Sequence, residues 1–77
     1  MTAAELSTLE AIRIWGGSFM KHIGAAYMAA DEQNRQKIRE TWPREWAQYV
    51  EQGERLREQE RAQEAAIAAA PVREEWR

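Results

Sequence analysis

The feature that most constrains this chain is a run of apolar and small residues that repeats at alternating steps of three and four. The run passes through Leu9, Ile12, Gly16, Phe19, Ile23, Ala26 and Ala30. Such steps place side chains on one face of an α-helix, and a sustained repeat is typical of a helix that packs along another helix. The pattern therefore predicts an all-α fold built from packed helices.

The first helix is expected to begin at Thr2 or at Ser7, each of which is followed three residues later by a glutamate, the spacing of a capping box. It is expected to extend to about Ala30. Gly16 and Gly17 leave two alternatives, because adjacent glycines allow close approach by a neighbouring helix but also mark sites where helices break. We favour one continuous helix.

On a helical wheel, this segment has a broad apolar face, which we expect to pack into the core. That face holds Leu9, Ile12, Trp15, Gly16, Phe19, Met20, Ile23 and Tyr27. The opposite side is only partly polar, since Ile14 and Ala25 lie there. A helix that is apolar on two sides is typically central in its assembly.

The remainder of the chain predicts a short connector helix and a long second helix. Asp31 is a suitable cap for the connector, which ends near Trp42, and Pro43 suits the first turn of the next helix. We expect helices of roughly residues 8–30 and 43–70 to pack as an antiparallel hairpin. Residues 1–70 would then form one helical domain and residues 71–77 a C-terminal tail.

Size and composition indicate self-association. A chain of 77 residues buries a thin core, and the absence of cysteine excludes disulfides as a supplement. The apolar groups outside one helix face then predict a helical-bundle homo-oligomer. We expect its interface to use Leu9, Ile12, Ile14, Gly16, Phe19, Ile23, Ala25 and Ala26.

No constellation in the sequence favours catalysis. Ser18 and His22 are four residues apart and would share a helix face, but no neighbouring residue in the sequence orients the histidine or supplies an oxyanion site. A single histidine without a cysteine also lacks partners at metal-ligand spacing. We expect a non-enzymatic protein with no catalytic residues, no cofactor and no bound metal.

One cluster of cations and indoles is the best candidate for a ligand site. It comprises Arg35, Arg39, Trp42, Arg44 and Trp46. Arginine binds phosphate and tryptophan stacks on aromatic rings, so this set suits a small anionic, nucleotide-like ligand. The alternative interpretation is that the two tryptophans anchor the core while the arginines lie on an ordinary surface.

Charge and hydropathy argue against nucleic acid and membranes as partners. The net charge is −2, whereas proteins that bind DNA or RNA usually carry a basic surplus. Arg13 and Lys21 interrupt the most apolar stretch, so no membrane span is expected. An acid at Glu5 and the absence of a basic region before an apolar run disfavour a signal peptide. We expect a cytoplasmic protein.

The segments LEAIRIWGGSF and AADEQNRQKIRETWPREWAQY, within Leu9 to Tyr49, resemble short proteins encoded by tailed phages and prophages. The resemblance implies a host-takeover or anti-defence factor in a bacterial host, which acts by sequestering a host immune protein or a nucleotide signal. The alternative is a small structural or adaptor protein. It would dock on a larger assembly through its charged third helix or its C-terminal tail.

Overall fold

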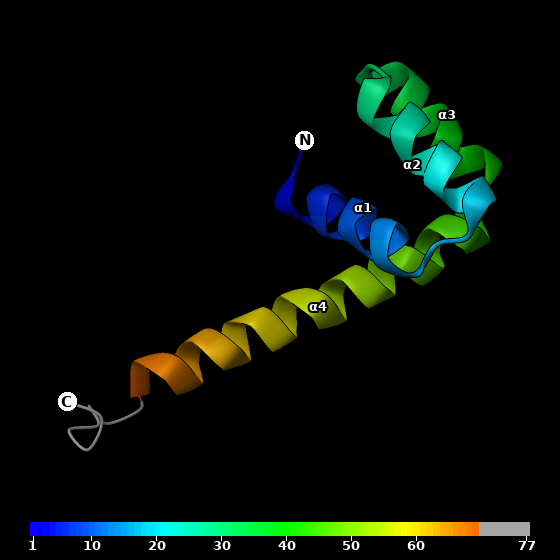
Figure 1. The fold of residues 1–77 in the computed structure, drawn as a ribbon. Helices are drawn as coiled ribbons and strands as arrows, with labels where there is room; N and C mark the ends of the chain where they lie inside the picture. Colours follow the sequence, from blue (N-terminus) through cyan, green and yellow to red (C-terminus); the bar gives the residue numbers. More distant parts are fainter. Residues whose placement is uncertain (70–77) are drawn as a thin grey trace.

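The computed structural model describes residues 1–69, and this part of the chain forms four helices without strands (Figure 1). In chain order they are α1 (Ala3–Trp15), α2 (Ser18–Ala29), α3 (Glu32–Thr41) and α4 (Pro43–Ala69). The prediction of an all-α fold is confirmed. The predicted tail of residues 71–77 lies outside the described residues.

A capping box at Thr2 begins α1. The Thr2 hydroxyl accepts a hydrogen bond from the Glu5 amide, and the Glu5 carboxylate accepts one from the Thr2 amide at 3.0 Å. Both interactions satisfy amides that have no partner within the helix. Of the two predicted starts, Thr2 is therefore correct, and Ser7 lies inside α1 with its hydroxyl donating to the Ala3 carbonyl.

The predicted continuous helix to Ala30 is wrong, because α1 ends at Trp15 and α2 begins at Ser18. Gly16 and Gly17 both adopt extended backbone conformations between the two helices. Each glycine would cost about 1 kcal/mol relative to alanine inside a helix, so two in succession make a break inexpensive. The Gly16 amide still donates to the Ile12 carbonyl and completes the last turn of α1.

The predicted start signals of the later helices are confirmed. The Asp31 carboxylate accepts a hydrogen bond from the Asn34 amide at 2.9 Å and caps α3. Trp42 leaves the helical conformation before Pro43, and the proline occupies the first position of α4. This follows from the steric restriction that proline places on the preceding residue and from its own fixed φ angle.

The core lies where α1, α2 and α4 meet. Its buried apolar side chains are Leu9, Ala11, Ile12, Met20, Tyr27, Trp46 and Tyr49. Trp15 and Phe19, expected in the core, instead expose 53% and 54% of their surface. The wheel that placed them there assumed one uninterrupted helix, whereas Trp15 is the last residue of α1 and Phe19 lies in the first turn of α2, on either side of the break.

The helix pair α1 and α4 forms the main packing contact, while α2 and α3 lie beyond it at one end of the molecule (Figure 1). A Cβ atom added to Gly53 would lie 2.7 Å from the main-chain carbon and oxygen of Ser7, so the two backbones almost touch. Beyond this crossing, α4 continues away from the other helices, and residues 58–69 are exposed. Within the described part, no helix combines the length and the apolar character that crossing a membrane requires.

Candidate binding site

Tyr27 on α2 is the centre of the best-connected cluster of side chains. It is fully buried, and its ring stacks on that of Trp46 from α4 with a centroid distance of 4.4 Å and an interplanar angle of 31°. Stacked aromatic pairs at this spacing contribute beyond the area they bury. The pair therefore fixes α2 against the first turns of α4.

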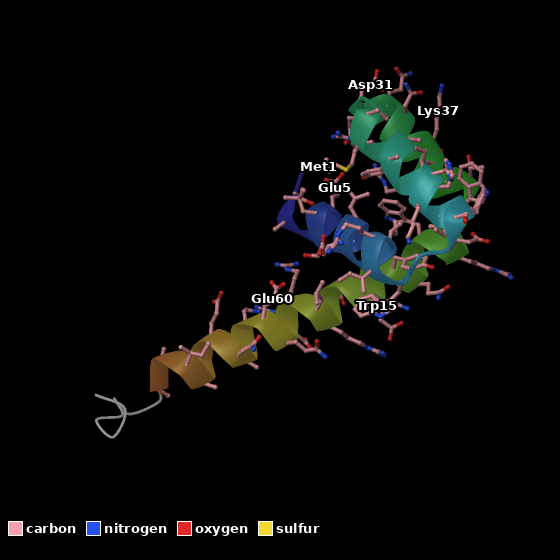
Figure 2. The ribbon with its side chains drawn as sticks, viewed as in Figure 1. Met1, Glu5, Trp15, Asp31, Lys37 and Glu60 are labelled. Carbon is pink, nitrogen blue, oxygen red and sulfur yellow. The ribbon has the colours of Figure 1, made fainter. Side chains whose placement is uncertain are left out.

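The Tyr27 hydroxyl joins three helices through hydrogen bonds. It donates to the carboxylate of Glu5 on α1 and accepts from Nη1 of Arg39 on α3 at 2.6 Å. Nη2 of Arg39 donates to Glu32 at 2.9 Å. Figure 2 shows Glu5 on the side of α1 that faces α2 and α3. A buried hydroxyl in such a network has both of its hydrogen-bonding roles satisfied.

These contacts shift the pKa values of the groups involved. The pKa of Glu5 falls from 4.5 to about 2, chiefly because Tyr27 donates to the carboxylate and next because the Thr2 amide does so. Burial raises the pKa of Tyr27, and its contact with Glu5 raises it further, while Arg39 opposes this shift. The hydrogen bond to Glu32 raises the pKa of Arg39. At neutral pH the network is thus a carboxylate, a neutral phenol and a guanidinium.

Arg35 on α3 contacts the same tyrosine and the carboxyl end of α2. Its Nε donates to the main-chain oxygen of Tyr27 at 3.0 Å, and its Nη2 donates to that of Met28 at 3.4 Å. The guanidinium carbon lies 5.5 Å from the centre of the Tyr27 ring. A cation at the carboxyl end of a helix donates hydrogen bonds to the last carbonyls and interacts favourably with the helix dipole. Arg35 therefore acts as a cap of α2.

The predicted ligand residues separate into four environments. Arg35 and Arg39 both lie over the Tyr27 ring, as their four-residue spacing on α3 predicts, and Trp46 is buried in the core. Trp42 is half-buried, with its ring edge-on to Phe19 at a centroid distance of 5.6 Å. Arg44 is exposed on the first turn of α4. The set does not converge on one cavity, and the ligand hypothesis stays a prediction.

The predicted interface residues also divide by burial. Leu9, Ile12 and Gly16 are buried within the chain and Ile23 is half-buried, whereas four others are exposed: Ile14, Phe19, Ala25 and Ala26. The exposed members do not share one face: Ile14 lies on α1, and on α2 the side chain of Ala25 lies on a different side from those of Phe19 and Ala26. The interface as a whole stays a prediction.

An apolar groove between α1 and α2 is a surface that the sequence analysis did not identify. It has a volume of about 480 Å³ and is lined by Leu6, Leu9, Ile12, Gly24, Ala25 and Met28, with Glu10, Arg13 and Lys21 also at its surface. Leu6 and Met28 are 53% and 59% exposed. In the sequence, most residues that line the groove follow the spacing of one helix face, i, i+3, i+4 and i+7. One set begins at Leu6 and continues through Leu9, Glu10 and Arg13; the other begins at Lys21 and continues through Gly24, Ala25 and Met28.

The His22 ring contacts the main chain of Ser18. Nδ1 of His22 lies 2.6 Å from the main-chain oxygen of Ser18, so the ring interacts with the backbone rather than with the hydroxyl. Among residues 1–69, no group of three or more histidine, cysteine, aspartate or glutamate side chains is arranged to hold a metal ion.

Together, the fold and these surfaces define a small helical protein whose polar side chains brace its helices and whose apolar side chains extend into a solvent-facing groove. Comparison of the chain with protein-family models, with curated proteins and with solved structures finds no match.

Proposed function

We propose that this chain is a non-enzymatic binding protein that works as a homo-oligomer and captures a host protein in the bacterial cytoplasm. The proposal adopts the host-takeover or anti-defence role that the resemblance to phage and prophage proteins implies. A single observation carries it: large apolar side chains on α1 and α2 remain in solvent, while the central arginines of the candidate ligand site are engaged within the chain.

The engagement of the arginines favours a protein over a nucleotide as the captured partner. Arg39 already donates to Tyr27 and Glu32, and Arg35 to two main-chain carbonyls, so turning either guanidinium toward a phosphate competes with these bonds. Each lost hydrogen bond of a charged group costs about 1.5–3 kcal/mol. Phe19, by contrast, already presents an exposed aromatic ring braced by Trp42, which is the kind of side chain that anchors protein interfaces.

The test of partner capture compares Phe19→Glu with Ile67→Glu, a matched change at an exposed apolar residue of α4. A host protein retained by the tagged wild type is purified, and its binding to each variant is measured by calorimetry. We expect Phe19→Glu to weaken binding by about tenfold or more and Ile67→Glu to leave it unchanged. Nucleotide co-purified in a native mass spectrum, and lost in the Arg35→Ala, Arg39→Ala double variant, would overturn the choice of a protein partner.

The second candidate is an adaptor that docks through the charged part of α4, and one observation favours it. Residues 58–69 form a helix that is exposed throughout and extends away from the core. In the same experiment, loss of binding with Ile67→Glu and retention with Phe19→Glu would select the adaptor role.

A further inference from the structure

The groove between α1 and α2 is mainly apolar, and its borders are open to solvent. Leu9 and Ile12 form its middle, since their side chains are the nearest atoms to a Cβ added at Gly24. Leu6 and Met28 also line it, each with more than half of its surface exposed. Pockets for small molecules usually bury most of the ligand, whereas an occupant here would keep one side in water. The groove is therefore better suited to a segment of protein, which covers the borders as well.

The two ends of the groove differ in polarity. The helix α2 folds back along α1, since the hydroxyl of Tyr27 near the end of α2 donates to Glu5 near the start of α1. The next residues in the chain, Leu6 and Met28, therefore make one end of the groove apolar. The charged residues of the lining lie toward the other end, next to the break between the helices: Glu10, Arg13 and Lys21.

The charged end has an excess of positive charge. Both carboxylate oxygens of Glu10 accept hydrogen bonds from Arg13, one from its Nε at 3.1 Å and the other from its Nη2. Lys21 makes no ion pair with any of residues 1–69. The sign of this end is thus opposite to the net charge of −2 of the whole chain. A carboxylate on the occupant would supply the partner that Lys21 lacks, so the groove favours acidic segments over basic ones.

The length of the groove matches two turns of a helix. Its walls run from Leu6 to Arg13 on α1 and from Lys21 to Met28 on α2. Each wall spans about 10 Å at a rise of about 1.5 Å per residue. An amphipathic helix in a groove presents apolar side chains at i, i+4 and i+7, which cover the same distance. A residue at i+11 continues this face by one turn and would lie beside Lys21.

We infer that the α1–α2 groove receives two turns of an amphipathic helix of the captured protein, with a carboxylate one turn beyond the apolar stripe paired with Lys21. The inference rests on the proposed capture of a host protein and adds a second contact surface and the chemistry of the segment that fills it. Phe19 lies on the opposite side of α2 from Met28, nine residues away along the helix. The two contacts can therefore be disrupted one at a time.

A pair of synthetic peptides tests the chemistry of the occupant. Both are alanine-based helices of about 16 residues, above the length at which isolated helices are marginal, with leucine at i, i+4 and i+7. One carries glutamate at i+11 and the other lysine. We expect the glutamate peptide to bind the wild-type chain about three- to tenfold more tightly, as measured by fluorescence anisotropy of labelled peptide. Equal binding would overturn the pairing with Lys21, and binding of neither peptide would overturn the helical occupant.

The two lysines of the chain provide a matched pair of variants. Lys37 is exposed like Lys21 but lines a separate groove between α2 and α3. Lys21→Glu should reverse the order of the two peptides, and Lys37→Glu should leave it as in wild type. Met28→Glu should weaken both peptides by about tenfold or more, whereas Ile67→Glu should leave both unchanged. Circular dichroism checks that each variant keeps its helicity.

The captured protein separates this inference from the proposed function. We expect Met28→Glu to weaken its binding by about tenfold or more, as Phe19→Glu does. If Phe19→Glu weakens binding while Met28→Glu and Lys21→Glu do not, capture stands and the groove is not its surface. If no host protein binds the wild-type chain, both proposals fail. A wild-type oligomer that Met28→Glu dissociates in light scattering would show that a second copy fills the groove, which would overturn the inference alone.

Discussion

Tyr27 is the residue on which the relative positions of the helices depend most directly. Its ring contacts Trp46 of α4, its hydroxyl reaches Glu5 of α1 and Arg39 of α3, and its own main-chain oxygen accepts from Arg35. A side chain with satisfied polar contacts in a small core specifies one arrangement of its neighbours. The ring and the hydroxyl make separable contributions.

Tyr27→Phe removes the hydroxyl and keeps the ring on Trp46. We expect a loss of about 1–2 kcal/mol in the free energy of unfolding, because Glu5 loses a donor and Arg39 loses an acceptor. Urea denaturation followed by circular dichroism measures it. Tyr49→Phe is the control, since Tyr49 is also largely buried but its hydroxyl makes no hydrogen bond within residues 1–69. Equal stability of Tyr27→Phe and wild type would show that the network contributes nothing net.

The lowered pKa of Glu5 predicts a loss of stability in acid. Its pKa is about 2 in the folded chain against an ordinary value of 4.5. Because folding lowers the pKa, the contribution of the carboxylate is complete above pH 4.5 and is lost as the pH falls from 4.5 toward 2. We expect the free energy of unfolding of wild type to decline across this window more steeply than that of Glu5→Gln.

The matched control for this pH dependence is Glu60→Gln, a change at an exposed position on α4. It should leave the acid slope of wild type in place. If Glu5→Gln shows the same slope as wild type between pH 4.5 and pH 2, the acid sensitivity arises from other groups.

Among the helices, the crossing of α1 and α4 has the least tolerance for added volume. By helix propensity alone, Gly53→Ala would stabilise α4 by about 1 kcal/mol. Its Cβ, however, would lie 2.7 Å from main-chain atoms of Ser7. Backbone cannot rotate away as a side chain can, so the helices must separate. We expect a net destabilisation of about 1–3 kcal/mol, measured by thermal or urea denaturation.

Gly17→Ala provides the comparison for this change. A Cβ at Gly17 would have no atom within 4 Å, and the backbone there is extended. We expect it to be tolerated with little change in stability. A Gly53→Ala protein as stable as Gly17→Ala would mean that the crossing relaxes without cost.

The start signals of the helices could be predicted from the sequence, because each depends on residues within a few positions of one another. Thr2, Asp31 and Pro43 act on their own turn of helix. The break at Gly16 and Gly17 was harder, since glycine pairs serve both close packing and chain breaks. The core positions of Trp15 and Phe19 were then misassigned because their placement assumed a continuous helix.

The polar side of the candidate site could be predicted only in part. The spacing of Arg35 and Arg39 correctly placed them on one side of α3, but local sequence does not reveal that Tyr27 lies beneath them. The same holds for Gly53, whose role comes from Ser7, 46 positions earlier in the chain. Contacts between distant segments are set by tertiary packing. Helix propensity and residue spacing describe only nearby positions, so they do not predict these contacts.

At the scale of the whole molecule, protection from solvent is uneven along α4. Trp46, Tyr49 and Gly53 are buried, whereas residues 58–69 are exposed. Amide hydrogen exchange should therefore be slow between residues 46 and 56 and faster from residue 58 onward, because isolated helical turns open without disturbing the core. Mass spectrometry of exchanged peptides measures this. Uniform protection along α4 would indicate that another subunit covers its distal half.

The close crossing at Gly53 gives α4 the geometry of a lever. With a rise of about 1.5 Å per residue, the helix from Gly53 to Ala69 extends roughly 24 Å beyond its pivot. A tilt of about 10° at the crossing would displace the far end by roughly 4 Å. A small rearrangement of α1 against α4 would thus be amplified at the distal end of the chain, where a pair of fluorophores or spin labels would register it as a change in distance.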